Sequence, residues 1–502
     1  MSLIRKLAGE TVIYGLSTII GRALNALLVP LYTYTLLDSQ YGVVAELYAL
    51  VGFLNVLFVH RMETAMFRYG SKAENRSKAF QTSSISVFGS TILLVGALLL
   101  SAQSIANWLE YPDQKQYVIW FALIMGFDAL SAIPFARLRL EGKAIRFVTI
   151  KLLNIGINIG LNLFFLVLCP YMIKQGYEGW SAIYSPEMGI GYIFIANLVA
   201  SAVTVLLLLP TYFSDRTKWQ FDRDQWRIMF KYAAPLVLVG FAGIVNEMLD
   251  RVLLKQLLEG NLDYRTGQIG IYSANYKIAM LITLFTTAFT YAAEPFFFRN
   301  ADRSDAPELY ATVAKWFTWV ACFGMMGILL FIDLFKYYVG PEFREGLDII
   351  PILLLANVFL GLYYNLAIWF KLTDKTIMGA YIAIGGALIT ILANWFLIPI
   401  LGYRGSAWAT LLCYFCMLLA SYWMGKRHYP IPYPLGRIAS VLILAMLIGY
   451  GSWAIRGLEM ISTPLSLGIN TGLFFLVLGI FYQLEKQELT TIFRSVKSSG
   501  NT

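Results

Sequence analysis

Residues 188–212, MGIGYIFIANLVASAVTVLLLLPTY, decide the fold class of this chain, because these 25 positions contain no charged residue. A helix needs about 20 apolar residues to cross a hydrocarbon core of about 30 Å, whereas a barrel strand needs only about 10 residues of alternating polarity. The run is long and apolar on every face, so it predicts a membrane-spanning helix. The segment that follows, FSDRTKWQFDRDQWR at 213–227, is the most polar linker of the chain.

The rest of the chain repeats this pattern of long apolar runs and short polar loops. Of its 502 residues, 58% are hydrophobic and 14% are charged. A soluble domain carries charge on about 25% of its residues. We therefore expect an all-α polytopic membrane protein with fourteen transmembrane helices. The expected spans are 8–36, 42–65, 80–103, 116–138, 144–169, 188–212, 228–257, 269–297, 311–334, 346–371, 376–400, 404–425, 433–455 and 463–483.

Lysine and arginine are distributed unequally between the loops on the two sides of these spans. The side that receives Arg68, Lys72 and Arg76 holds about three times as many basic residues as the side that receives Lys115 and Arg265, which is the positive-inside pattern. We therefore expect a multi-pass protein of the bacterial cytoplasmic (inner) membrane with both termini in the cytoplasm. Because the net charge of +9 lies in these loops, it does not indicate a nucleic-acid partner.

The polar linker after the sixth span gives the predicted domain organisation. It separates an N-lobe of six helices from a C-lobe of six helices, and a final pair of helices follows the C-lobe. The predicted boundaries are 1–212 for the N-lobe, 213–227 for a cytoplasmic linker, 228–428 for the C-lobe and 429–502 for the last two helices with a cytoplasmic tail.

The two sets of six helices resemble each other in sequence. GVVAELY at 42–48 in span two aligns with GIYSANY at 270–276 in span eight, with the glycines and the final tyrosines in register. INIGLNLF at 157–164 in span five aligns with ITILANWF at 389–396 in span eleven. Because six is even, matched spans keep the same orientation. The pattern predicts a parallel repeat about a pseudo-two-fold axis along the membrane normal, with two lobes facing each other across a cleft.

Several short motifs resemble those of a known family. They are Gly21-Arg22 in the first span, Tyr41-Gly42 at the start of the second, the basic loop after it, and LGYRGSAWAT at 401–410. In these features the whole chain resembles the polysaccharide flippases of the multidrug/oligosaccharidyl-lipid/polysaccharide (MOP) exporter superfamily. The resemblance implies two six-helix lobes in a V shape, with alternating access. The superfamily includes O-antigen-type flippases and the lipid II flippase. The resemblance implies that this chain shares the fourteen spans of the lipid II flippase, and that Arg22 and Arg61 correspond to arginines in its early helices.

Two arginines lie at depths where the bilayer disfavours charge: Arg22 in the first span and Arg251 in the seventh. Such a charge costs about 3 to more than 10 kcal/mol, so it normally faces a wet cavity or a partner. We expect both arginines to contact the pyrophosphate of an anionic head group. Lys277 is a further candidate contact, and Arg61, near the cytoplasmic end of span two, is a candidate entry point that could instead extend to the interface.

Acidic residues within the spans are candidates for charge pairs or coupling-ion sites. The alternative for Arg22 is a buried ion pair with Glu46 or Asp128. In span seven, Glu247 lies four residues before Arg251, where the two can pair on one helix face.

Asp250 is the second acid of span seven and has no local basic partner by this reading. An acid stranded in a low dielectric is a candidate site for proton or cation coupling. Lys277 is its alternative partner.

Polar side chains on span five form a stripe that must point into the helix bundle. Asn154, Asn158 and Asn162 recur at close to helical spacing, and Lys151 precedes them. They either bond neighbouring helices or line a cavity that accepts sugars. Asn394 in span eleven and the pair Tyr363 and Tyr364 in span ten are further candidate cavity residues, the tyrosines as surfaces for sugar rings.

The favoured hypothesis is a flippase that moves a polyprenyl-pyrophosphate-linked oligosaccharide from the cytoplasmic to the outer leaflet for cell-surface polysaccharide or O-antigen-type synthesis. A polymerase or ligase of the same pathway is a possible partner. A cation-coupled multidrug antiporter of the MATE type and a lipid II flippase are the alternatives. A membrane scaffold without transport activity is disfavoured by the intramembrane charges.

The sequence shows no P-loop, no nucleotide fingerprint and no nucleophile–base arrangement. We therefore expect no enzymatic activity, no cofactor and no metal site. Transport would be driven by a Na⁺ or H⁺ gradient or by the membrane potential.

Overall fold

The computed structural model describes residues 19–213, 219–457 and 463–499. Within these ranges thirteen helices are long and apolar enough to cross a membrane. Each overlaps one predicted span, from the second to the fourteenth, and the regular elements in these ranges are all helical. The protein is therefore an all-α multi-pass membrane protein. The predicted first span begins outside the described residues, so the count of fourteen and the location of both termini stay predictions.

The chain divides into two compact units. Unit 1 comprises Met1–Asp302 and Val339–Pro430, and unit 2 comprises Arg303–Tyr338 and Ile431–Thr502. The helices of unit 1 are α2 (Leu28–Thr35), α3 (Asp38–Val59), α4 (Met62–Tyr69), α5 (Ala73–Leu100), α6 (Ala102–Trp108), α7 (Lys115–Leu140), α8 (Ala144–Leu163), α9 (Cys169–Lys174), α10 (Gly191–Tyr212), α11 (Arg223–Leu257), α12 (Leu262–Ala279), α13 (Leu281–Arg299), η6 (Pro341–Ile349), α16 (Ile350–Leu366), α17 (Ile368–Leu372), α18 (Thr376–Leu401) and α19 (Tyr403–His428). Those of unit 2 are α14 (Ala306–Leu330), α15 (Ile332–Phe335), α20 (Leu435–Gly457) and α21 (Thr463–Ser499).

Several predicted spans are interrupted in the structure. Span two breaks between α3 and α4, where His60 and Arg61 adopt left-handed backbone conformations with φ of 37° and 56°. Such a conformation costs a non-glycine residue about 1–3 kcal/mol. The break also frees backbone groups, and the hydroxyl of Ser90 donates to the carbonyl of Phe58 at 2.9 Å, which satisfies one of them. Spans eight and ten break at Met280 and Ala367.

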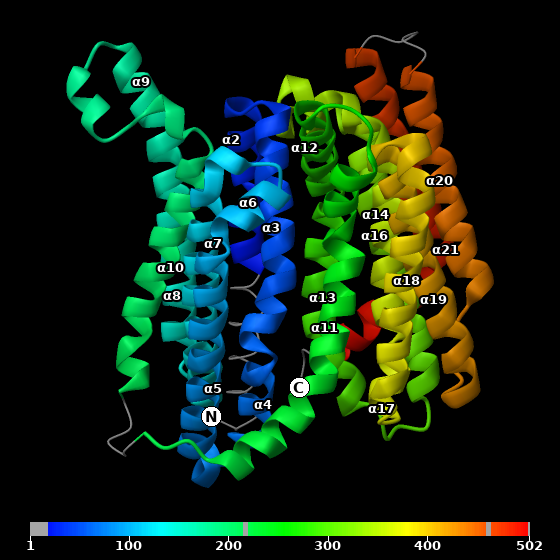
Figure 1. Cartoon of the computed structure of the whole chain (residues 1–502). Coiled ribbons are helices and arrows are strands. Elements are labelled where there is room, and N and C mark those ends of the chain that lie inside the picture. The colour runs from blue at the N-terminus through cyan, green and yellow to red at the C-terminus, as the bar shows by residue number, and fades with distance from the viewer. Residues whose placement is uncertain (1–18, 214–218, 458–462, 500–502) are drawn as a thin grey trace. The chain divides into compact units, whose positions relative to one another are not determined.

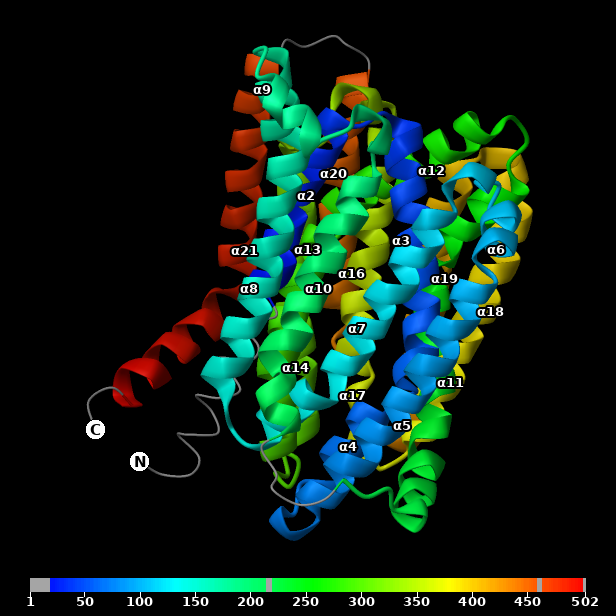
Figure 2. The same ribbon diagram turned by 60° about the vertical axis from the view of Figure 1, so that its left-hand side comes forward.

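In unit 1, α3 is the central contact between early and late helices. It packs against α12 and α11, and both Figure 1 and Figure 2 place α3 beside α12. On its other side α3 packs against α7, which also contacts α5 and α10. Two ends of the unit are distinguished below: the α11–α12 end, which is uppermost in Figure 1, and the α4–α5 end, which is lowermost.

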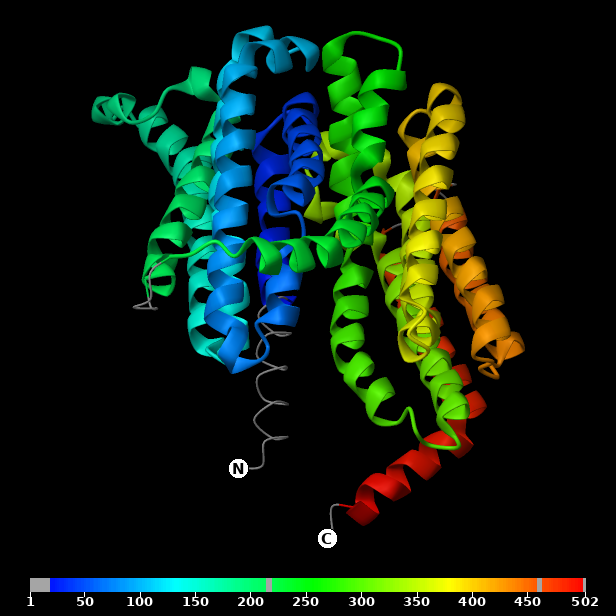
Figure 3. The same ribbon diagram turned by 60° about the horizontal axis from the view of Figure 1, so that its bottom comes forward.

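The predicted linker ends earlier than expected, because Asp222 caps a helix. Its carboxylate accepts from the backbone N–H of Gln225 at 2.6 Å, and α11 begins at Arg223. This start of α11 is attached to α5 by an ion pair of 2.7 Å between Asp222 and Lys78 and by a bond of 2.9 Å from the indole of Trp226 to Ser86. Figure 3 shows the green start of α11 crossing the blue helices before it turns into its span. Residues 214–218 of the linker lie outside the described part.

Unit 2 joins α14 to α20 and α21 through buried charges. Glu485 on α21 accepts from Lys315 at 2.7 Å, from Arg437 at 3.0 Å and from the indole of Trp319 at 3.0 Å. The prediction had assigned the ninth span, which is α14, to the C-lobe. In the structure α14 belongs to the same compact unit as the last two helices. The division into two lobes of six helices stays a prediction.

Candidate functional site

Two adjoining cavities lie in unit 1 beside α3. The lower cavity, of about 780 Å³, extends towards the α4–α5 end, and the upper cavity, of about 360 Å³, lies towards the α11–α12 end. Asn154 of α8 and Asn197 of α10 line both cavities. The two cavities therefore form one polar tract, which is lined by helices from the first six spans and by α11 and α12.

The lower cavity has a charged wall made by α7, α8 and α10. Asp128 accepts a hydrogen bond of 2.7 Å from Ser201, and Asn154 donates to Thr204 at 2.9 Å. Lys151 lies 4.7 Å from the centre of the Phe135 ring. Asp128 and Lys151 are exposed although both belong to membrane-spanning helices, and both line this cavity. Charged groups at that depth require a wet surface, so the cavity is a solvated one.

Arg61 lines the lower cavity from the break between α3 and α4. Its guanidinium lies against α11, where a Cβ added to Gly240 would approach Nη2 to 2.3 Å. Its ion pair with Glu63 is long, at 3.8 Å. Arg61 therefore lies in the wall of the cavity, and its role as an entry point stays a prediction.

Arg251 lines the upper cavity, but its charge is balanced. Its Nη1 donates to Asp250 at 2.6 Å and to the backbone carbonyl of Glu247, and the guanidinium lies 5.2 Å and 4.4 Å from the ring centres of Tyr272 and Tyr276. Asp250 also accepts from the hydroxyl of Tyr272. The predicted pair of Arg251 with Glu247 and the predicted stranding of Asp250 are therefore wrong. The Asp250 side chain turns towards α12, where Tyr272 fixes it beside Arg251.

Lys277 also lines the upper cavity, and its charge is not balanced by an ion pair. It makes no hydrogen bond or ion pair with another residue of the described ranges. The predicted alternative pair of Lys277 with Asp250 is not formed, because Asp250 is held by Arg251 and Tyr272. Glu247 is the acid whose charge acts on Lys277, yet it forms no ion pair among the described residues. An interior ammonium without a bonded counter-charge is costly, and an anion beside it would lower that cost.

Arg22 is exposed and donates to the hydroxyl of Thr287 on α13 at 2.9 Å. It is not among the residues that line the two cavities. The alternative pairs predicted for Arg22 are not formed, because Glu46 pairs with Lys255 at 3.1 Å and Asp128 bonds Ser201. Of the two arginines expected to meet the head group, only Arg251 lies in the tract.

The predicted asparagine stripe divides between the cavity and the helix contacts. Asn158, like Asn154, lines the upper cavity. Asn162 is fully buried and accepts from the hydroxyl of Tyr32 at 3.1 Å. Asn394, its partner in the predicted repeat, is fully buried too. Both buried asparagines donate to the carbonyl four residues before them at 2.8 Å, so the cavity role expected for these two is wrong.

The tyrosine pair of α16 lies outside the tract. Tyr363 is buried in a hydrophobic cluster with Cys413, Tyr414 and Met417. Its expected contact with sugar rings is wrong, because the ring faces the protein core. Tyr364 is about half exposed and lines a separate small cavity beside the ion pair between Glu294 and Lys371.

The sequence profile of the polysaccharide biosynthesis protein family matches residues 7–301. The chain belongs to this family. No curated protein matches the sequence. Among solved structures, the chain is similar to "Lipid II flippase MurJ, inward closed conformation". The match covers 94% of this chain and 99% of that structure's chain, with 14% identity and a TM-score of 0.68.

A second similar structure is titled "Inward-facing conformation of a multidrug resistance MATE family transporter of the MOP superfamily". It covers 84% of this chain and 95% of its own, with 13% identity and a TM-score of 0.62. At such identities the likeness concerns the fold. The all-α class predicted for this family member is thereby confirmed.

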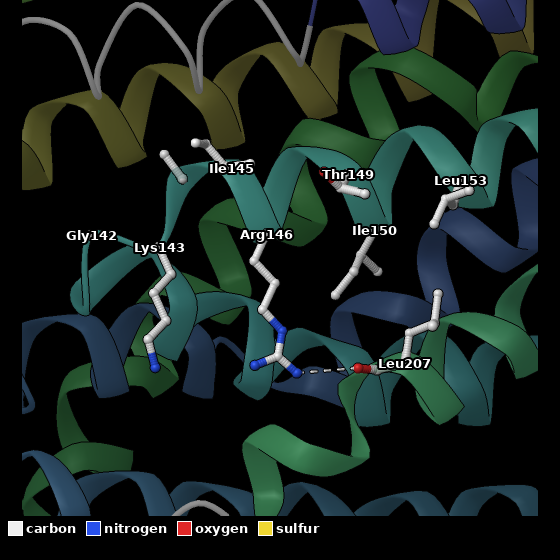
Figure 4. Close-up of a pocket in the computed structure, with 9 residues that line it drawn as sticks. Gly142, Lys143, Ile145, Arg146, Thr149, Ile150, Leu153 and Leu207 are labelled. Carbon is white, nitrogen blue, oxygen red and sulfur yellow. Dashed lines mark hydrogen bonds between the residues drawn. The ribbon is translucent and has the colours of Figure 1, made fainter.

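A third cavity of this polysaccharide biosynthesis family member, of about 770 Å³, lies at the start of α8 (Figure 4). Its basic side chains are Lys143 and Arg146, and its walls are largely apolar. Lys143 pairs with Glu141 at 2.7 Å, and Arg146 donates to the carbonyl of Leu207 at 3.4 Å, the bond drawn as a dashed line in Figure 4. Both cations of this cavity therefore have protein partners, unlike Lys277 of the upper cavity.

The sequence analysis missed several members of the site in this family member. Lys255, near the end of the predicted seventh span, was not among the candidates, but it is buried and pairs with Glu46, which also accepts from the Tyr111 hydroxyl at 2.7 Å. Its position one turn after Arg251 on the same helix is a signal that was available. Asn197 and Ser201 were also missed, although their spacing of four residues places both on one face of a predicted span.

Proposed function

We propose that this protein is a flippase that moves a polyprenyl-pyrophosphate-linked oligosaccharide from the cytoplasmic to the outer leaflet by alternating access. Its family and its fold, which is shared with a lipid II flippase, support a lipid-linked substrate. The distribution of basic loops supports an inner membrane with both termini in the cytoplasm. O-antigen-type or other cell-surface polysaccharide synthesis is the pathway we favour, with a polymerase or ligase as the downstream partner.

The observation that carries the proposal is the unbalanced charge of Lys277 beside the balanced charge of Arg251. A pyrophosphate entering the upper cavity would supply the missing counter-charge of Lys277. The side-chain bonds of Arg251 in the described part all involve Nη1, which leaves Nε and Nη2 for phosphate oxygens. Guanidinium groups bind such oxygens in a fork geometry, and an ammonium adds a mobile point charge.

The sugars would occupy the polar tract that leads to these cations. Asn154, Asn158 and Asn197 offer amide donors and acceptors along it, and Asn197 already donates to the hydroxyl of Tyr48 at 2.9 Å. Amides and hydroxyls exchange bonds with sugar hydroxyls and water at little net cost. Arg61 at the start of the tract would meet the head group first.

The driving force we propose is a Na⁺ or H⁺ gradient or the membrane potential, without a cofactor and without catalysis. A unit charge moved through the membrane gains about 2.3 kcal/mol per 100 mV. Glu247 is our candidate for the coupling group, because it is exposed, unpaired in the described part and electrostatically linked to Lys277.

A multidrug antiporter is the second candidate, and Asp128 is the observation that favours it. This acid lines the lower cavity and forms no ion pair with another described residue. A cationic drug would bind there, whereas the upper cavity favours an anion. A lipid II substrate would use the same cations as a lipid-linked oligosaccharide, and only the sugar part would differ.

Reconstituted vesicles test the proposal. Flipping of a labelled polyprenyl-pyrophosphate oligosaccharide is compared in wild type, Lys277→Ala and Lys174→Ala, a lysine that is exposed and lies outside the tract. We expect Lys277→Ala to lose about tenfold or more in rate and Lys174→Ala to be unchanged, because a charge-assisted contact contributes about 1.5–3 kcal/mol. Full activity of Lys277→Ala, or drug efflux in place of lipid movement, would overturn it.

A further inference from the structure

At the α11–α12 end of the tract, the backbones of α3 and α12 are in close contact. A Cβ added to Gly42 would lie 1.8 Å from the carbonyl oxygen of Thr266, and one added to Gly270 would lie 2.0 Å from that of Asp38. Both distances are far below van der Waals contact, and the opposing atoms are backbone atoms that cannot turn aside. Only glycine at both positions allows the helices to approach this closely.

This contact is reciprocal. Gly42 and Gly270 are aligned in the predicted repeat, and Asp38 and Thr266 are separated by the same number of residues. Gly42 faces Thr266 and Gly270 faces Asp38, so the two contacts are equivalent under the repeat. Reciprocal contacts of this kind arise where a two-fold axis passes through an interface. The crossing consequently lies where pseudo-symmetric halves would meet.

Buried charge ties the same end together. Lys255 at the end of α11 pairs with Glu46 of α3 at 3.1 Å, and the two side chains are 1% and 2% exposed. The ammonium also donates to the carbonyl of Leu109, and Tyr111 donates to Glu46 at 2.7 Å. An ammonium and a carboxylate at such burial are favourable only while they remain paired. Separating α3 from α11 would expose both to water.

Two further contacts join early and late segments at this end. Arg265 of α12 donates to both carboxylate oxygens of Glu110, at 3.1 Å and 2.6 Å. The backbone N–H of Gly340 donates to the hydroxyl of Thr33 on α2 at 3.0 Å, and a Cβ at Gly340 would lie 1.9 Å from the Thr33 carbonyl oxygen. The closure therefore extends from α2 to the segment after α6.

We propose that the glycine crossing of α3 and α12 is the outer seal of the transport path, and that the pair between Lys255 and Glu46 is its latch. The inference rests on the proposed transport function and on the proposed orientation of the chain, but its test needs no substrate. Tyr41, next to Gly42, lines the upper cavity. The crossing thus stands directly beyond the site of Lys277, and the substrate leaves only when α3 and α12 separate.

A methyl group at either glycine forces the two backbones apart and so disfavours the sealed state. The population then shifts towards the state in which the upper cavity is reached from outside. A glycine in open space provides the matched control, because a Cβ on Gly156 of α8 meets no heavy atom within 4 Å. Gly156→Ala therefore adds the same methyl group to a membrane helix without touching a neighbour.

Cysteine labelling tests the seal. The four native cysteines are replaced by serine, and Ser273→Cys provides a reporter in the upper cavity at a position whose hydroxyl is buried without a bond. A membrane-impermeant maleimide is added outside right-side-out vesicles. We expect Gly42→Ala and Gly270→Ala each to raise the labelling rate by about tenfold and Gly156→Ala to leave it unchanged. Unchanged labelling in a folded Gly42→Ala protein would overturn the seal.

Glu46→Gln is the second variant and keeps both glycines. It removes the latch charge, so labelling should rise by about tenfold as well, and unchanged labelling would overturn the latch. If Gly42→Ala and Gly270→Ala do not accumulate as folded proteins, labelling of Glu46→Gln tests the seal in their place. Because labelling needs no substrate, its outcome is independent of the Lys277→Ala transport result, and failure of one proposal is separable from failure of the other.

Discussion

Lys277 and Arg251 line the same cavity but differ in what balances their charge. Asp250 and the rings of Tyr272 and Tyr276 surround Arg251, whereas Lys277 has no such partner among the described residues. Removing one member of a buried pair leaves a charge without compensation, and removing an isolated buried charge relieves a cost. At the residue scale, stability and function should therefore respond in opposite directions at Lys277.

We expect Asp250→Asn to lower the free energy of unfolding by about 3 kcal/mol or more, because Arg251 is left unpaired. Lys277→Met keeps the length of the side chain and should leave stability unchanged or raise it by about 1 kcal/mol, although transport is lost. Thermal unfolding of the purified proteins in detergent measures both effects. Equal losses of stability in the two variants would contradict this assignment of charges.

The sequence placed Lys277 and Arg251 in the interior, because apolar runs of spanning length surround both. It did not show which cation is balanced. Glu247 and Asp250 are both close to Arg251 along the helix, and the choice between them depends on Tyr272 of α12, which fixes one carboxylate. The burial of Lys255 was missed for a similar reason, since its partner Glu46 belongs to another helix.

Helices were predicted well where they are long and poorly where they break. The thirteen spans found in the described ranges overlap the predicted ones because each contains about 20 apolar residues in a row. The breaks at His60, Met280 and Ala367 were not predicted, since neither a proline nor a glycine occupies them. Tertiary contacts, such as the hydrogen bond from Ser90 to the carbonyl of Phe58, stabilise a helix break that the local sequence does not predict.

The link between Glu110 and α12 gives a prediction at the scale of elements. A hydrogen bond from Arg265 lowers the pKa of the Glu110 carboxyl below its usual value. A carboxylate whose pKa is lowered by folding stabilises the protein above its unfolded pKa, and this contribution is lost as the pH falls through the lowered value. The pair should thus hold the α6–α7 segment to α12 at neutral pH and release it in acid.

We expect Glu110→Gln to lower the unfolding temperature at neutral pH, by a small amount because the pair is partly exposed. The difference from wild type should vanish as the pH falls below the carboxyl range. Glu259→Gln, at an exposed acid of the same end, should match wild type throughout. A difference that persists at low pH would contradict the assignment to Glu110.

At the scale of the whole molecule, the grouping of α14 with α20 and α21 was not predictable from hydropathy. α14 is distant from α20 and α21 in the chain, and Glu485 of α21 connects the three helices by accepting from Lys315, Trp319 and Arg437. Apolar patterning assigns each of these helices to the membrane but carries no information about its neighbours. The predicted repeat did carry information about neighbours, because the aligned glycines Gly42 and Gly270 face each other in the structure.

We expect Glu485→Ala to lower the free energy of unfolding by about 3 kcal/mol or more, since it removes the acceptor shared by three donors. Glu488→Ala is the matched control, because Glu488 also pairs with Lys315 but is 49% exposed, and its loss should be below about 1 kcal/mol. Thermal unfolding of the two proteins measures the difference. Comparable losses would show that the buried acceptor contributes no more than the surface pair.

The anchoring of α11 has a mechanical consequence. One end of this helix is fastened to α5 through Asp222 and Lys78, and the other is fastened to α3 through Lys255 and Glu46. Between them Pro235 interrupts the hydrogen-bond ladder. The helix is therefore held at both ends and can bend at one position between them. Late helices that move relative to early ones must either bend α11 at Pro235 or break one of its two ion pairs.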